Sequence, residues 1–320
     1  MSSVKVFAEG VTKQITEFLP SDLQDVQCSV VENMKNNSVV MTGITFHMPG
    51  KNVAPVIYME PFFEKIKNGE PVNEVMENIA NCFRDCHDCQ DITKGIDMNN
   101  YESVKDYIMP MVINTRRNRR MLTALPHERM EDLSVIYKVV FPNDRLDGVS
   151  SVKITEEIAD RWGVSQSKLH KQAMDNGSQK RPPILQGMEV VAREILFQEK
   201  ISENLLEAEG MLAVDEPMYI LSNPERMEGA SVLAYPDLLK QVDAKFDGGC
   251  YILPSSIHEC IVVPKRMGMS PKELGDMVRE VNASEVDREE VLSDRVYEYD
   301  RDRNCLSQVE ASLKQREMER

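Results

Sequence analysis

The chain has 320 residues, of which 42% are hydrophobic, so it is long enough to bury a substantial core. Its 53 acidic residues outnumber its 38 lysines and arginines, and the formal charge of -15 disfavours nucleic acid and anionic membranes as partners. No apolar run approaches the roughly 20 residues of a membrane-spanning helix, and no signal-peptide core follows Met1. We therefore expect a cytoplasmic protein without a membrane partner.

The first part of the chain predicts a helix, an antiparallel β-meander and two more helices. Pro20 stops the first helical pattern, Asn36-Asn37 supplies a turn, and Gly69 separates the last two helices. The expected elements are a helix over 4–19, strands over 26–30, 39–46 and 53–59, and helices over 61–67 and 71–89.

The middle of the chain is less regular but still gives clear helix boundaries. Thr155 and Ser165 are typical helix-capping residues, and Trp162-Gly163 and Asn176-Gly177 are typical helix ends. The expected elements are an element over 107–114, a buried strand over 133–141, a partner strand over 150–154, and helices over 155–162 and 166–176.

The segment from Gly177 to Pro183 predicts a boundary, because its two prolines cannot continue a helix. A long helix from Met188 to Ala208 is expected next, followed by elements in the order β-α-β-β-α-β, the split-βαβ arrangement. The fold class is α+β. The expected regions are an N-terminal α+β region (1–180), a connecting helix (181–216), the β-α-β-β-α-β unit (217–300) and a charged, frayed or disordered tail (301–320).

Four polar residues lie at the turn of a predicted β-hairpin: Ser255, Ser256, His258 and Glu259. A hydroxyl, an imidazole and a carboxylate are the groups of a hydrolase site. On a strand, however, His258 and Glu259 point to opposite faces, and Gly-x-Ser-x-Gly and His-Glu-x-x-His are both missing. The favoured interpretation is a structural hairpin, in which the hydroxyls bond the turn backbone.

A basic run places four guanidiniums within five residues, at Arg116, Arg117, Arg119 and Arg120. Such a cluster can pair with phosphates or acidic groups. No aromatic side chains are interleaved for base stacking, and no phosphate-binding glycine loop is present. A solvated face that balances an acidic surface is the favoured interpretation, and an anion clamp is the alternative.

Three cysteines, Cys82, Cys86 and Cys89, lie near His87 and resemble a set of zinc ligands. Their spacing continues an apolar helical stripe from Val75, so we expect small core residues and no metal. We expect no cofactor either. The total of seven cysteines without an export signal indicates reduced thiols rather than disulfides.

Several segments, Met218–Asn223, Gly229–Pro236, Cys250–Pro264 and Leu292–Asp300, resemble a bacterial family of unknown function. The similarity is densest in Leu253–Glu259, Glu280–Asn282 and Leu292–Asp294. It covers the chain from the N-terminal helix to about Asp300. The resemblance implies a cytoplasmic protein of anaerobic bacteria, often encoded near mobile elements, and it transfers no activity and no catalytic residues.

The sequence therefore favours a non-enzymatic binding or regulatory protein with an unidentified protein or small-molecule partner. The alternative is a hydrolase- or transferase-like enzyme for a small phosphorylated or acyl substrate. In that case Ser255 or Ser256 would act with His258, and the basic run would hold the anion. Convergence of these residues in one pocket distinguishes the two hypotheses.

Overall fold

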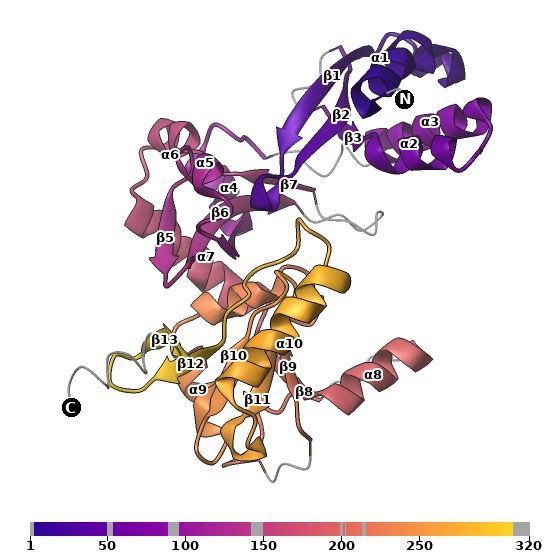
Figure 1. Cartoon of the computed structure of the whole chain (residues 1–320). Coiled ribbons are helices and arrows are strands. Elements are labelled where there is room, and N and C mark those ends of the chain that lie inside the picture. Colours follow the sequence, from indigo (N-terminus) through magenta and orange to yellow (C-terminus); the bar gives the residue numbers. More distant parts are fainter. Residues whose placement is uncertain are drawn as a thin grey trace. The chain divides into compact units, whose positions relative to one another are not determined.

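The computed structural model describes residues 3–49, 54–88, 96–141, 150–198, 201, 203–212 and 216–309 (Figure 1). The chain divides into two compact units. Unit 1 comprises the described residues of Met1–Asp97 and of Phe141–Ser150, and unit 2 those of Met98–Val140 and Ser151–Arg320. The boundary expected near residue 181 lies inside unit 2.

Unit 1 contains the predicted β-meander, in the strand order β1-β2-β3 with antiparallel pairing throughout. Asn37 has a φ of 57° in the turn between β1 and β2, a conformation that asparagine tolerates better than most residues. The main elements are α1 (Val4–Gln14), β1 (Gln27–Met34), β2 (Val40–His47), β3 (Val56–Tyr58), α2 (Glu60–Lys67) and α3 (Val72–Asp88).

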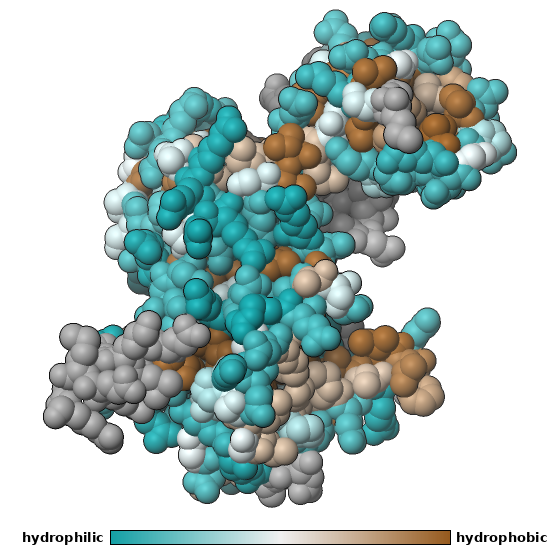
Figure 2. Space-filling model, in the orientation of Figure 1, coloured by the Kyte–Doolittle hydropathy of each residue, from teal (hydrophilic) through white to brown (hydrophobic). Residues whose placement is uncertain are grey.

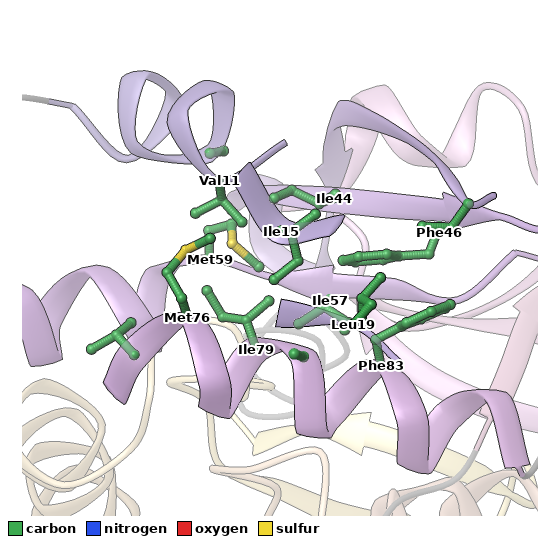
Figure 3. Packing of buried hydrophobic residues seen from close by; sticks show 14 of the residues in the cluster. Val11, Ile15, Leu19, Ile44, Phe46, Ile57, Met59, Met76, Ile79 and Phe83 are labelled. Atoms are coloured by element: carbon green, nitrogen blue, oxygen red, sulfur yellow. The ribbon is translucent and has the colours of Figure 1, made fainter. Parts of the chain in front are cut away.

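The core of unit 1 lies between the meander and its helices (Figure 3). Val11 of α1 and Ile79 of α3 point into it, because their helices present apolar residues at three- and four-residue spacing. Phe83 of α3 stacks on Phe46 of β2, with ring centroids 4.5 Å apart. Both rings are completely buried.

Unit 2 begins with a sheet in the order β4-β6-β5, and β7 also pairs with β6. Helix α6 ends as predicted at Gly163, whose φ of 63° is left-handed. Helix α7 continues past its expected end, because Asn176 donates hydrogen bonds to the carbonyls of Lys105 and Ile108. The elements are α4 (Tyr101–Val104), β4 (Ile108–Asn114), α5 (Arg119–Leu122), β5 (His127–Met130), β6 (Leu133–Phe141), β7 (Ser150–Lys153), α6 (Glu156–Trp162) and α7 (Gln166–Lys180).

The second sheet of unit 2 has the order β13-β12-β10-β11-β9-β8, with antiparallel pairing throughout. Strands β9 and β10 therefore run in the same direction on either side of β11. Helix α10 lies across this sheet (Figure 1), and its Leu274 and Val278 pack with Leu253 and Val263. The elements are β8 (Ile184–Gly187), α8 (Met188–Phe197), β9 (Tyr219–Ser222), α9 (Leu238–Ala244), β10 (Cys250–Leu253), β11 (Cys260–Pro264), α10 (Pro271–Ser284), β12 (Tyr297–Asp300) and β13 (Cys305–Gln308).

Two expectations for this region were wrong. The long helix ends at Phe197, and residues 203–212 are not helical, because Asn204 bonds the amide of Leu185 and holds this segment along β8. Part of the expected tail, Cys305–Gln308, is an edge strand.

Across the described ranges, no helix is long and apolar enough to cross a lipid bilayer.

Candidate functional site

The predicted hairpin is formed by β10 and β11, with Leu253 paired to Ile261 at the end next to the connecting loop. Its connection, residues 254–259, is held by backbone hydrogen bonds from a distant segment. The amide of Leu292 donates to the carbonyl of Ser255 at 2.7 Å, and the amide of Ile257 donates to the carbonyl of Glu290 at 2.9 Å. The connection is thus built into unit 2 by main-chain pairing.

The imidazole of His258 contacts groups at both of its nitrogens. Nδ1 accepts a hydrogen bond from the amide of Glu228 at 3.2 Å, so this nitrogen carries no proton. The neutral ring then has its proton on Nε2, which lies 3.2 Å from Oε1 of Glu290. The partner carboxylate of His258 is therefore Glu290, which the sequence did not identify, rather than the adjacent Glu259.

The hydroxyl groups near the imidazole bond the backbone. Oγ of Ser256 accepts a hydrogen bond from the amide of His258 at 3.1 Å, and Ser222 donates to the carbonyl of His258 at 2.7 Å. Ser255 is buried. Hydrogen bonds from short polar side chains to nearby main-chain groups are common in tight connections between strands.

A buried ion pair holds the loop that bonds His258. Lys138 of β6 donates a hydrogen bond to Oε1 of Glu228, and the two side chains are only 7% and 15% exposed. Nη1 of Arg181 lies 3.9 Å from the other carboxylate oxygen of Glu228.

Gly229 comes directly after Glu228 in the chain, and a Cβ at this position would lie 2.4 Å from the carbonyl oxygen of His258. The close approach of this loop to the hairpin therefore requires glycine.

The basic run does not act as one cluster in the structure. Arg117 bonds Oδ2 of Asp294 at 2.6 Å. The side chains of Arg116, Arg119 and Arg120 are exposed. One of the four arginines is thus paired with a half-buried carboxylate, and the other three stay candidate anion ligands.

Arg117 belongs to a network that connects the first and second sheets of unit 2. Asn282 of α10 donates to Oδ1 of Asp294 at 2.8 Å, and Asn114 of β4 donates to the carbonyl of Leu292 at 3.0 Å. The three segments with the densest family resemblance meet here, since the amide of Ser293 also bonds the carbonyl of Pro254. No local sequence pattern predicted this convergence, because the three segments are far apart in the chain.

A hollow of about 500 Å³ lies elsewhere in unit 2. Its lining runs from Met211 through α9 and the turn at Asp247-Gly248 to Arg301. The lining includes no residue of the hairpin connection and none of the basic run. This hollow therefore does not provide the shared pocket that the enzyme hypothesis requires.

The cysteine stripe is only partly described. Cys82 is half-buried and packs against the core of unit 1. Cys89 and the side chain of His87 lie outside the described residues. Among the residues that are described, no group of three histidine, cysteine or acidic side chains is placed to hold a metal.

Cys28 of β1 gives a pH-dependent prediction, because burial raises the pKa of its thiol from 9.0 to about 11. The folded chain holds this proton more tightly than the unfolded chain. The resulting stabilisation is complete below pH 9 and is lost as the pH rises towards 11. We expect the free energy of unfolding of unit 1 to fall across this range, and to fall less in Cys28→Ala. Urea titrations at several pH values measure both slopes.

Val30 supplies the control, because it is a partly buried residue of the same strand without a titratable group. Val30→Ala should lower stability equally at every pH and leave the slope of the wild type. A slope in Cys28→Ala equal to that of the wild type would refute the assignment to this thiol.

These observations define an α+β protein with two compact units and a histidine-containing hairpin braced by polar networks. Residues 4–301 match the model of a family described as Family of unknown function (DUF5688), and the chain belongs to this family. No curated protein and no solved structure gives a significant match.

Proposed function

We propose that the protein acts by binding a partner, as a non-enzymatic binding or regulatory protein. The observation that carries this proposal is the state of His258, whose Nδ1 accepts a backbone hydrogen bond and whose Nε2 faces Glu290. A general base for serine needs a free nitrogen within hydrogen-bond reach of the hydroxyl. In this structure Nδ1 contacts the amide of Glu228 and Nε2 contacts the carboxylate of Glu290, and neither of these groups is a serine hydroxyl.

The thiols support a cytoplasmic location within this proposal. Cys250 and Cys260, which are both buried, are free thiols. Free thiols suit a reducing compartment. Burial raises the pKa of both Cys250 and Cys260, so their reactive thiolate forms are suppressed.

The hairpin's structural role predicts a loss of stability in His258→Ala. This variant leaves the amide of Glu228 without its acceptor, and we expect a loss of about 1–2 kcal/mol in the free energy of unfolding. His258→Asn is the matched control, because its amide oxygen can accept the same bond and should restore part of the loss. Urea unfolding of the three proteins measures the difference.

A covalent serine probe separates this proposal from the enzyme alternative. A fluorophosphonate reacts with serine hydroxyls that a neighbouring base activates. We expect no labelling at Ser255 or Ser256 in the folded protein. Labelling of the wild type that disappears in Ser255→Ala, Ser256→Ala or His258→Ala would reject the non-enzymatic proposal and favour a hydrolase- or transferase-like activity.

A binding function also requires a partner that the folded protein retains. Immobilised wild type, exposed to lysate of its own source, should retain a macromolecule or metabolite, and Ser256→Ala should retain the same one. Reproducible failure to retain any component would count against the proposal. If the protein is instead a hydrolase-like enzyme, the retained molecule would be a substrate, which Ser256→Ala binds but does not convert.

A further inference from the structure

The end of helix α8 exposes three consecutive large apolar residues: Ile195, Leu196 and Phe197. Their exposed fractions are 71%, 75% and 68%. Figure 2 shows hydrophobic surface over this helix. Single exposed apolar residues are common on proteins, but a contiguous group on one projecting element marks an interaction surface.

Contacts earlier in α8 hold the helix in place, so the position of its apolar end is defined. Val191 is buried, and Glu194 accepts a hydrogen bond from Arg226. Oε1 of Glu194 also accepts a bond from the amide of Ile201 at 2.7 Å. These contacts hold α8 at the edge of the second sheet up to the residue before Ile195.

The three exposed residues cover more than one face of the helix. Successive residues are rotated by about 100°, so the group spans roughly 200° of the circumference. We name Ile195, Leu196 and Phe197 the α8 tip. The α8 tip therefore offers apolar contacts over more than half of the circumference at the end of the helix.

The described chain on either side of the α8 tip is acidic. Residues 181–198, 201, 203–212 and 216 include six acidic residues and two basic ones. Three exposed acidic residues belong to this part of the chain: Glu189 on α8, and Glu203 and Glu207 on the segment after it. The exposed basic residue of α8 is Arg193. The amide of Ile201 donates to Oε1 of Glu194, which brings the start of the acidic segment back to α8 one residue before the tip.

We infer that the α8 tip binds a protein segment whose apolar face is flanked by lysines and arginines. This inference rests on the proposed binding function and assigns it a surface and a partner chemistry. Apolar burial supplies affinity, and the acidic surroundings select a basic partner. A second copy or an anionic bilayer would place negative charge against a chain of formal charge -15, so both are disfavoured.

The test uses a designed probe, a fluorescent helical peptide with leucines on one face and lysines on the other. We expect the full-length wild type to bind it, with binding that weakens as salt is added. The variant Ile195→Gln/Leu196→Gln/Phe197→Gln should raise the Kd at least tenfold, measured by fluorescence anisotropy. An analogue peptide with glutamates in place of the lysines should not bind.

Val72→Gln is the matched control, because Val72 is also exposed, at 55%, but lies on α3 of unit 1. Its Kd should stay within about twofold of the wild type, since single exposed apolar residues on other elements contribute little. Equal circular dichroism spectra and melting midpoints would establish that both variants fold. An unchanged Kd in the triple variant, or equal binding of the glutamate peptide, would overturn the inference.

Two further outcomes would assign the α8 tip to another occupant and overturn the inference. The first is a wild-type dimer in sedimentation that the triple variant loses. The second is cosedimentation with phosphatidylglycerol vesicles that the triple variant loses. Retention of the lysate partner by the triple variant would reject this surface and leave the binding function standing, whereas labelling of Ser255 by the serine probe would reject the function itself.

Discussion

Phe83→Ala should lower the free energy of unfolding of unit 1 by about 3–5 kcal/mol. The ring is completely buried and stacks on Phe46, so alanine loses both the apolar burial and the aromatic contact. It also leaves a cavity between α3 and the meander, where Figure 3 shows the two rings together. Urea unfolding of the full-length chain, followed by circular dichroism, measures the loss.

Val72→Ala is the control on the same helix. Val72 is 55% exposed, so this change should stay within about 0.5 kcal/mol of the wild type. Because the chain has two compact units, hydrogen exchange of the α1 and α3 amides should assign the loss to unit 1. A Phe83→Ala protein as stable as Val72→Ala would contradict the observed packing.

Lys138→Met should destabilise unit 2 by about 3–5 kcal/mol, because it removes one partner of a buried ion pair. The carboxylate of Glu228 is 15% exposed, and its remaining cation, Arg181, lies 3.9 Å away. A negative charge that is buried without a close partner is costly, whereas the methionine fills much of the space of the lysine. Urea unfolding of the full-length variant measures the loss.

The double variant Lys138→Met/Glu228→Gln is the control, because it removes both charges of the pair. We expect it to recover at least half of the stability lost in Lys138→Met. In the double variant the backbone amide of residue 228 should still donate its hydrogen bond to Nδ1 of His258, which its amide resonance reports. A double variant that is less stable than Lys138→Met would show that the buried charge is not the cause.

The parts of the fold that were predicted correctly depend on local signals. The β-meander follows from alternating residues and the turn at Asn37, and the end of α6 follows from the left-handed conformation that Gly163 adopts easily. Two edge strands were not predicted, because they depend on distant partner strands rather than on local signals. Strands β8 and β13 are four residues each, and only their partners β9 and β12 distinguish them from irregular chain.

In the candidate site, too, the features that were predicted depend on residues close in the chain, and those that were missed depend on distant residues. The sequence identified the hairpin and its serine and histidine side chains, because they lie within five positions. The partners of His258 are 30 and 32 positions away, at Glu228 and Glu290, and no periodicity relates them. Arg117 likewise joins the network through Asp294, which is 177 positions distant.

The sequence by itself determined the α+β class, the acidic charge and most helices and central strands, since these depend on residue type and on spacing over a few positions. The tertiary structure alone decided what the polar residues do. It directed His258 towards a backbone amide and a distant carboxylate, buried Lys138 against Glu228, and left the α8 tip exposed. Hydrogen bonding and burial depend on which segments meet in space, and that is set by packing of the whole unit rather than by neighbours in the chain.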